Sequence, residues 1–281
     1  YVEKVWGLDP SEISRTVAKQ RVSTSAPLQT FRRALTSSAE TDRSFLYPTN
    51  GMASLILHLR RQAEELGVEI YGGRRFDADT DRSPFGSIFF SGHLDHLVPD
   101  SGLEHRGLYI LHLAYPSGLV PGHDTWYTPE LKYWFGRVSQ PQRFSPALKS
   151  EGRDVLCVEI PEGRWGKGRD FISELDTITK QLCDAGILQR EVRPIASQQT
   201  WIDRVYPIYR RGWYERWRVA LDQVAEQGPV FPIGRQGLFL HCNMDHCVHI
   251  SSEAVQHVSS GGDAKGWVER CVDFLDLRVR D

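Results

Sequence analysis

The hydrophobic positions of this chain fall into two kinds of pattern, and the helical pattern is the clearer one. After the segment YPTNG, apolar residues recur three or four positions apart. This spacing predicts a helix whose apolar stripe is Leu55, Ile56, Leu59, Ala63 and Leu66. Thr49 or Asn50 would cap that helix, and Gly67 would end it. The same periodicity predicts helices at 170–185, 213–226 and 264–278.

Between 76 and 145 the pattern changes to short runs rich in β-branched and aromatic residues, bounded by Gly, Pro and Asp. These runs predict strands at Ser87–Gly92, Gly107–Tyr115, Asp124–Thr128 and Lys132–Ser139. We expect them to form one antiparallel sheet layer. Further strands or extended segments are predicted at Val68–Tyr71, Asp154–Ile160 and Val205–Tyr209.

The N-terminal segment carries weaker signals. Pro10 and Ser11 open a short helix that would continue through Val17 and Gln20, and the Ser- and Thr-rich stretch 23–44 predicts a loop. The chain starts at Tyr1 without methionine, in a sequence typical of the interior of a protein. We therefore expect that the protein was processed, that its start is missing, or that a partner chain supplies it.

The segment 230–258 (VFPIGRQGLFLHCNMDHCVHISSEAVQHV) predicts a buried strand, a glycine turn at Gly234 and Gly237, a polar loop, and a helix. Asn243 or Asp245 would cap the helix. Its apolar stripe would be Cys247, Ile250, Ser251, Ala254 and Val258. A strand, a glycine turn and a helix N-terminus together direct backbone N–H groups at an electron-rich ligand. A tight turn and a helix cap without any ligand remain the alternative.

Composition limits the classes of function. The 281 residues are 40% hydrophobic and 25% charged, which is ordinary for a globular protein of one large or two modest domains. A net charge of -2 gives no electrostatic reason to expect nucleic acid or an anionic membrane as a partner. No apolar run is long enough to span a bilayer, and no signal peptide is visible. The five cysteines lack CxxC spacing, so we expect them to be reduced and the protein to be cytoplasmic.

The His and Cys residues of the C-terminal segment raise the question of zinc. His241, Cys242, His246, Cys247 and His249 lie close together in sequence. However, Cys247 belongs to the apolar stripe of the predicted helix, and no second ligand pair occurs at a familiar spacing. No metal is expected, and zinc remains the lesser alternative.

Other motifs give few catalytic assignments. There is no GxGxxG after an early strand, no Walker loop and no GxSxG, and no catalytic residue can be named. Arg106 and Arg137 stand beside glycines near strands, where an arginine can bind a diphosphate or a carboxylate. A solvated or salt-bridged strand arginine is the alternative. Tyr127 and Tyr206 could line a cleft or belong to the core.

Several segments, in this order, resemble one protein family. YVEKVWGLDPSEIS, YPTNGMASLILHL, FFSGHLDHLVPDSGLEHRGL, WYTPELKYWFGRVSQPQRFSP, VYPIY and IGRQGLFLHCNMDH are similar to segments of FAD-dependent oxidoreductases. The family is the superfamily of amine oxidases, protoporphyrinogen oxidases and UDP-galactopyranose mutases. The resemblance covers nearly the whole chain. It departs where His93 and Leu94 replace an expected proline, and where His241 and Cys242 replace the usual neighbours of the last motif.

The resemblance implies a fold and a cofactor. The fold would be α/β (α+β): a substrate-binding, mixed or antiparallel sheet domain with helices, plus the C-terminal part of a Rossmann-like FAD-binding domain. Residues 1–75 would be a helical segment with a strand, 76–200 the substrate-binding sheet domain, and 201–281 the FAD-contacting segment. The implied FAD contacts are Gly234, Arg235, Gly237, Asn243, Met244 and Asp245. The implied substrate contacts are Arg137, Arg106, Tyr206 and Tyr127.

The family's FAD pyrophosphate binds a GxGxxG unit that this sequence lacks. The resemblance therefore implies part of an FAD-dependent oxidoreductase that acts on a small molecule, in a heteromer with a chain carrying GxGxxG. One alternative is a nucleotide-sugar mutase, like UDP-galactopyranose mutase. Another is a non-catalytic partner, deficient in FAD, of an intact flavoprotein.

Overall fold

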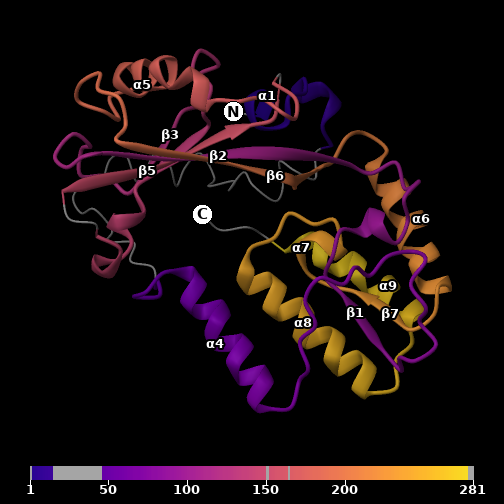
Figure 1. Ribbon diagram of the computed structural model, residues 1–281. Coiled ribbons are helices and arrows are strands. Elements are labelled where there is room, and N and C mark those ends of the chain that lie inside the picture. Colours follow the sequence, from indigo (N-terminus) through magenta and orange to yellow (C-terminus); the bar gives the residue numbers. More distant parts are fainter. Residues whose placement is uncertain (1, 15–45, 150–151, 164, 278–281) are drawn as a thin grey trace, which may run out of the picture. The chain divides into compact units, whose positions relative to one another are not determined.

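The chain forms two units in the computed structural model, which describes residues 2–14, 46–149, 152–163 and 165–277 (Figure 1). Unit 1 contains the described residues of Tyr1–Asp9, Ala39–Gly72 and Arg106–Val205, and unit 2 those of Pro10–Ser38, Gly73–His105 and Tyr206–Asp281. Each unit is therefore assembled from stretches that lie far apart in sequence. The expected division at 75 and 200 into cofactor and substrate regions stays a prediction.

Unit 1 is built on a five-stranded sheet with the order β3-β4-β5-β2-β6. Its strands are β2 (Glu104–Pro116), β3 (Thr125–Tyr127), β4 (Arg137–Ser139), β5 (Arg153–Pro161) and β6 (Ala196–Ile208). The pairs β3–β4, β4–β5 and β2–β5 are antiparallel, as the sequence predicted for this region. Strand β4 is shorter than the predicted Lys132–Ser139, and most of β6 was not predicted.

One face of this sheet carries the core of unit 1. The helix α5 (Leu175–Asp184), preceded by the 3-10 turn η5 (Ile172–Glu174), covers that face in Figure 1. Leu111, Val138 and Val158 are completely buried there and align across three strands. The predicted inward positions Phe171, Leu175, Ile178 and Leu182 belong to the same core. Burial of these apolar side chains is the main stabilising contribution to the unit.

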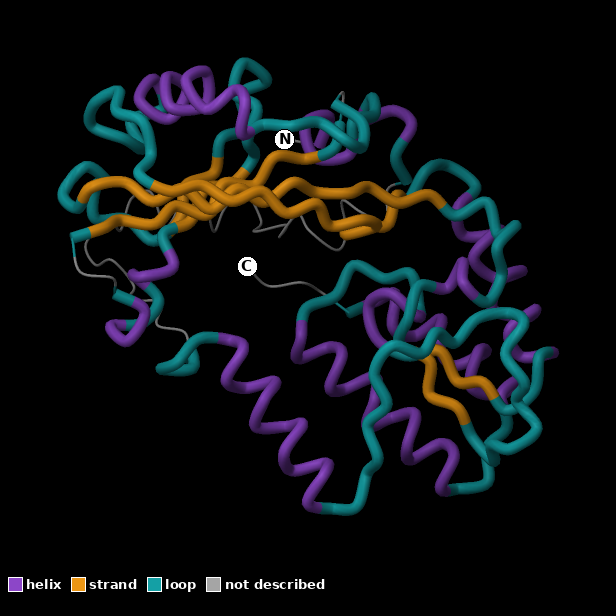
Figure 2. The backbone as a smooth tube through the Cα atoms, in the orientation of Figure 1, coloured by secondary structure: helices purple, strands orange, loops and turns teal. Residues whose placement is uncertain are grey.

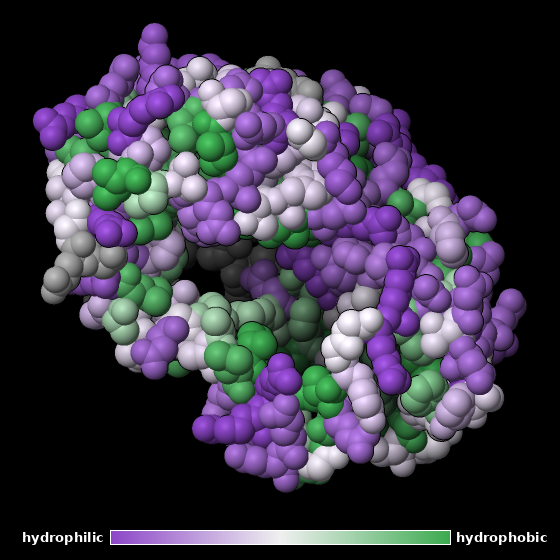
Figure 3. Space-filling view, in the orientation of Figure 1, coloured by the Kyte–Doolittle hydropathy of each residue, from purple (hydrophilic) through white to green (hydrophobic). Residues whose placement is uncertain are grey.

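The helix α4 (Met52–Glu65) begins and ends almost where the sequence predicted, but no residue of it is buried. Leu55, Ile56 and Leu59 are exposed, and Figure 3 shows hydrophobic side chains at the surface along α4. The prediction of Thr49 or Asn50 as the cap was wrong, because Gly51 is the N-cap. Gly67 follows the end of the helix with a positive φ, as expected for a C-terminal glycine.

The predicted strand Val68–Tyr71 is not formed. These residues are exposed loop, because no strand in the described part of the chain pairs with them. A lone extended segment has no ladder of hydrogen bonds to hold it. The smaller elements of unit 1 are α1 (Val2–Trp6), η3 (Pro141–Arg143) and η4 (Pro146–Leu148).

Unit 2 contains a two-stranded parallel sheet, β1 (Ile88–Phe90) with β7 (Val230–Pro232), and a set of helices. The helices are α6 (Trp213–Glu226), α7 (Gly234–Gly237), α8 (Met244–Ser259) and α9 (Ala264–Arg270). The 3-10 turns are η1 (Pro10–Glu12), η2 (Leu94–His96) and η6 (Cys271–Asp276). The predicted strand Ser87–Gly92 thus exists in shorter form, but its assignment to the antiparallel layer was wrong.

The predicted helices near the two ends of the chain differ from the elements that the structure shows there. The predicted helix 264–278 consists of α9 followed by η6. The predicted start at Pro10 is a single 3-10 turn, while Val17, Gln20 and the stretch 23–44 lie outside the described residues. Among the described helices, none is long and apolar enough to cross a membrane.

Candidate functional site

The candidate cofactor segment begins at the parallel strand pair of unit 2, which Figure 2 shows in orange beside the helices. Ile88, Phe89 and Phe90 of β1 align with Val230, Phe231 and Pro232 of β7. All three residues of β7 are buried. Ile233, next in sequence, donates its N–H to the carbonyl oxygen of Phe90 at 2.8 Å, which extends the pairing to the start of the turn.

The structure explains the two glycines of the predicted turn in different ways. Gly234 has a φ of 68°, a conformation that residues with a Cβ rarely adopt. Gly237 has an ordinary φ, but a Cβ there would lie 2.3 Å from the carbonyl oxygen of Phe90. Gly237 is therefore required for the close packing of α7 on β1. This packing alone accounts for a glycine at 237, without any ligand and for a different reason from the tight turn considered in the sequence analysis.

The segment after the turn is a buried wall and not the polar loop that the sequence predicted. Leu238, Phe239 and Leu240 are almost completely buried, as are His241 and Cys242. Buried aromatic side chains fix the backbone of this wall and of β7. Trp217 Nε1 donates to the carbonyl oxygen of Leu238 at 2.8 Å, and Trp267 Nε1 donates to that of Pro232 at 2.9 Å.

Helix α8 begins at the end of this wall. Asn243 is its N-cap, as predicted, and the backbone N–H of Asn243 donates to His246 Nδ1 at 3.2 Å. Asn243, Met244 and Asp245 are exposed. Ile250 and Ala254 of the predicted stripe are buried, so the helix packs on the predicted face. The positive end of a 16-residue helix is thus presented at the surface of unit 2.

Arg235 connects this segment to Tyr206. Its guanidinium lies 5.5 Å from the centre of the Tyr206 ring, and its Nη1 donates to the carbonyl oxygen of Cys242 at 3.3 Å. Two residues that the sequence assigned to different ligands, Arg235 to FAD and Tyr206 to substrate, are therefore neighbours within unit 2.

The three histidines of the zinc alternative make separate contacts in the structure. His241 packs its ring against Tyr209, His246 takes part in the cap of α8, and the ring of His249 meets Phe274. Within the described residues, no group of three or more His, Cys, Asp or Glu side chains is placed to hold a metal ion.

Cys242 and Cys247 do come together, with their Sγ atoms 3.7 Å apart. The hydrogen bond with Cys242 is the largest effect that lowers the pKa of Cys247; the backbone N–H and the guanidinium of Arg235 contribute less, and burial opposes the shift. The same hydrogen bond, together with burial, raises the pKa of Cys242. The spacing of the two cysteines gave no signal for this pair at the sequence level, because it matches no common motif.

Two of the candidate substrate residues lie side by side in unit 1. Tyr127 aligns with Arg137 across β3 and β4, and Arg137 aligns with Glu159 across β4 and β5. The three side chains form a row on the sheet face opposite the core positions Val138 and Val158. Arg137 Nε donates to Glu159 Oε1 at 2.8 Å, and Nη2 donates to the same oxygen at 2.5 Å.

The polar residues of this row differ in exposure. The Arg137 side chain is 45% exposed, whereas that of Glu159 is only 10% exposed. Sequence reasoning did not identify Glu159, which reads as an ordinary charged position of a strand. Arg106 is not part of the row, because its Nε donates to the carbonyl oxygen of Trp6 at 2.7 Å.

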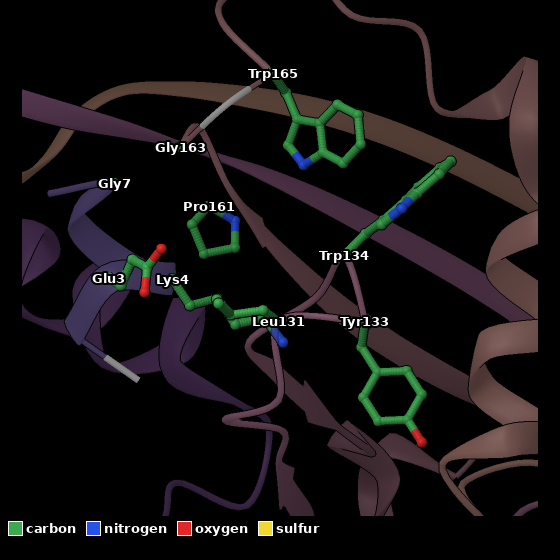
Figure 4. A pocket seen from close by; sticks show the side chains of 9 residues that line it. All are labelled: Glu3, Lys4, Gly7, Leu131, Tyr133, Trp134, Pro161, Gly163 and Trp165. Carbon is green, nitrogen blue, oxygen red and sulfur yellow. The ribbon is translucent and has the colours of Figure 1, made fainter. Parts of the chain in front are cut away.

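A cavity of about 230 Å³ that the sequence did not predict lies in unit 1 (Figure 4). Helix α1 contributes Lys4, and the indole rings of Trp134 and Trp165 form another side, with their centres 4.9 Å apart. The Lys4 ammonium donates to the carbonyl oxygens of Thr128 and Glu130 at 2.6 and 2.7 Å. Lys4 therefore fastens α1 to the loop after β3.

No protein-family model matches the chain, and no curated protein sequence matches it. Its fold is similar to that of reduced UDP-galactopyranose mutase, with a TM-score of 0.75 and 17% identity over 97% of this chain and 66% of that chain. It is also similar to a protein from Exiguobacterium sp. 255-15 assigned as a protoporphyrinogen oxidase, with a TM-score of 0.61 and 13% identity over 92% of this chain and 62% of that chain.

At these identities the likeness shows the fold alone, and this chain spans less than two thirds of each of those chains. The expected fold class is confirmed: the fold is mixed α/β, with an antiparallel sheet, a parallel strand pair and helices, as in the two similar proteins.

Proposed function

We propose that this chain is the substrate-binding and flavin-facing part of an FAD-dependent oxidoreductase that acts on a small molecule. A second segment, which carries GxGxxG, would hold the adenosine and pyrophosphate of the FAD. The fold shared with a mutase and with an assigned protoporphyrinogen oxidase supports this proposal. So does the order of the sequence segments that resemble the FAD-dependent family.

The observation that carries the proposal is the arrangement of β7, α7 and α8, which follow one another in the chain. Gly234 has a positive φ, the wall that follows is fixed by buried tryptophans, and the first turn of α8 is exposed at Asn243, Met244 and Asp245. These residues suit the flavin ring of FAD, because the partial positive charge at a helix N-terminus favours the negative charge of a reduced ring. When bound, FAD would supply the hydride-accepting chemistry.

In this proposal Gly234, Arg235 and Gly237 lie beside the flavin, with Gly237 allowing α7 to approach β1 closely. The guanidinium of Arg235 adds a positive charge near the start of α8, where its Nη1 already bonds the carbonyl of Cys242. Tyr206, which lies under that guanidinium, would hold Arg235 in place and border the same ligand.

Exposed apolar surface on α4 and the loop after it supports a second segment. Leu55, Ile56 and Leu59 of α4 are 37%, 59% and 52% exposed, and Val68 and Ile70 in the following loop are also exposed. A helix that is apolar on one face normally buries that face. A dinucleotide-binding segment with an open sheet would cover α4 and pair with 68–71. We place the assembled protein in the cytoplasm, since all five cysteines are free.

A nucleotide-sugar mutase is the second candidate for the reaction. Its support is the row Tyr127, Arg137 and Glu159, in which a half-exposed arginine lies beside an exposed tyrosine. A planar guanidinium can bind a diphosphate with two parallel hydrogen bonds, and a tyrosine ring can stack on a base. Arg106, tied to α1, is the weaker candidate for such a contact. A non-catalytic partner subunit would keep the fold and lack the flavin.

The test is to purify the chain together with a chain or segment that carries GxGxxG, and to record absorbance at the flavin bands. We expect a yellow complex that retains FAD through gel filtration, and a chain that binds little flavin when purified alone. A colourless complex that gains no flavin when FAD is added would contradict the oxidoreductase and mutase candidates together, and would leave the non-catalytic partner.

A further inference from the structure

Cys242 and Cys247 lie at the junction between the buried wall and helix α8. Their Sγ atoms are 3.7 Å apart, within the range of a weak hydrogen bond between thiols. A disulfide bond has its sulfur atoms about 2.05 Å apart, so these two atoms would have to approach by about 1.7 Å. Cys242 immediately precedes the N-cap, and Cys247 lies in the first full turn of α8. Only the first turn of the helix would be enclosed by such a bond.

The surroundings of the pair shift the pKa values of its two thiols in opposite directions. The pKa of Cys247 is lowered by the Cys242 thiol and then by the backbone N–H and guanidinium of Arg235, while burial and Asp245 oppose this effect. The pKa of Cys242 is raised. Cys242 is 3% exposed, whereas Cys247 is partly exposed. A thiolate beside a protonated thiol is the arrangement of a nucleophilic and a resolving cysteine.

The remaining cysteines provide an internal contrast. Burial raises the pKa of Cys157, of Cys183 and of Cys271. Within the described residues, Cys247 is the cysteine whose pKa is lowered. The feature is therefore specific to the start of α8 and does not apply to cysteines of this protein in general.

We infer that Cys242 and Cys247 form a peroxide-reactive thiol pair, in which Cys247 is the nucleophile and Cys242 closes an intramolecular disulfide. The Cys247 thiolate attacks one oxygen of hydrogen peroxide, the O–O bond breaks, and the hydroxide that leaves takes a proton to become water. The Cys242 sulfur then attacks the Cys247 sulfenic acid, the S–O bond breaks, and a second water leaves with the proton of Cys242. Two thiols are oxidised, and one peroxide is reduced to two waters.

The disulfide would act on the candidate cofactor segment. A Cβ on Gly234 would lie 3.9 Å from Cys247 Sγ, so this sulfur backs the turn that leads into α7. Movement of the sulfur toward Cys242 would change the packing behind Gly234 and restrain the first turn of α8. The thiol pair requires no flavin, so its chemistry can be tested on the purified chain whether or not FAD binds.

The experiment is treatment of the reduced full chain with one equivalent of hydrogen peroxide, followed by alkylation, digestion and mass spectrometry. Trypsin leaves both cysteines in one peptide between Arg235 and Lys265, and cleavage before Asp245 then separates them. We expect the two products to stay joined, with the loss of two hydrogens, until a reductant is added. Oxidation of Cys157 or Cys183 before Cys247 would overturn the inference. So would digestion products of Cys242 and Cys247 that stay separate after peroxide treatment.

Variants and a pH profile separate the two roles. In Cys242→Ser, Cys247 should accumulate as a sulfenic acid that dimedone traps, and Cys247→Ser should abolish both the disulfide and the trapped product. In the wild-type chain, iodoacetamide should modify Cys247 about tenfold faster than Cys271 at neutral pH. The rate for Cys247 should reach half of its maximum at a pH below about 8.5, which is the pKa typical of free cysteine. A half-maximal rate at or above that pH would count against Cys247 as the nucleophile, even if a variant failed to fold.

Discussion

Gly237 lies directly against the carbonyl oxygen of Phe90, at a separation that leaves no room for a side chain. A Cβ at Gly237 would be 2.3 Å from that oxygen, and the obstruction is backbone that cannot rotate away. The close approach joins α7 to β1 across a long separation in sequence. It therefore fixes where the candidate cofactor segment begins relative to the parallel strand pair of unit 2.

The first prediction follows from this approach. Gly237→Ala should lower the free energy of unfolding by about 1–3 kcal/mol, because the backbone of α7 or β1 must shift to admit the methyl group. Urea unfolding monitored by tryptophan fluorescence measures the effect. Gly86→Ala is the matched control, since a Cβ there meets nothing within 4 Å. Equal stability of the two variants would show that α7 does not pack on β1 in this way.

The second prediction concerns the buried wall. Trp217→Phe removes the N–H that donates to the carbonyl oxygen of Leu238 and leaves that oxygen without this bond in the core of unit 2. The expected loss of unfolding free energy is about 1–3 kcal/mol. Tyr214→Phe in the same helix is the control, because Tyr214 is exposed and should change stability little. Thermal unfolding of both variants and of the wild type measures these changes in stability. A Trp217→Phe variant as stable as the wild type would contradict the role assigned to Trp217.

The sequence predicted best those features that depend on nearby residues. The stripe of α8, its cap Asn243, the core positions of α5 and the glycine after α4 follow from spacing and residue type alone. Strand β6 was largely missed because it lies at the edge of its sheet and its residues 197–199 are polar, so hydrophobic alternation is weak there. The partner of β1 is β7, far along the chain, and no local pattern encodes such a pairing.

The errors at α4 have a different physical reason. The apolar stripe of α4 predicted a buried helix face, and the residue types of 68–71 predicted a paired strand. In the described part of the chain, both segments are exposed. Local sequence can indicate that a face is suited to burial, but it cannot say which segment covers it. For the candidate site, residue types suggested Arg137 and Tyr127, whereas the strand register was needed to show that they are neighbours and that Glu159 joins them.

The third prediction tests the mutase candidate with two substitutions that should change the affinity for a nucleoside diphosphate in opposite directions. Arg137→Ala should weaken binding of a nucleoside diphosphate by about 10- to 150-fold, since a charge-assisted hydrogen bond contributes roughly 1.5–3 kcal/mol. Glu159→Gln should tighten binding, because it removes the carboxylate that competes with the diphosphate for Arg137. Isothermal titration of the flavin-loaded complex with UDP measures both affinities.

Arg190→Ala, a change at an exposed arginine, is the control for loss of positive charge. Circular dichroism should show that all three variants keep the fold. Unchanged UDP affinity in Arg137→Ala would remove the mutase candidate and leave the oxidoreductase proposal standing, because the flavin-facing segment does not include this residue.

The last prediction concerns the exposed face of α4. Ile56→Glu and Leu59→Glu should each reduce the flavin recovered with a GxGxxG-carrying partner, because a charge would be buried where an apolar contact is proposed. Neither change should lower the stability of the chain alone, since both side chains are exposed in it. Arg61→Gln, at an exposed position on the opposite face of the same helix, makes the same change in net charge and should leave recovery unchanged. If the two apolar variants recover as much flavin as the control, α4 is not the surface that the second segment covers; if they unfold the chain alone, α4 already packs within it.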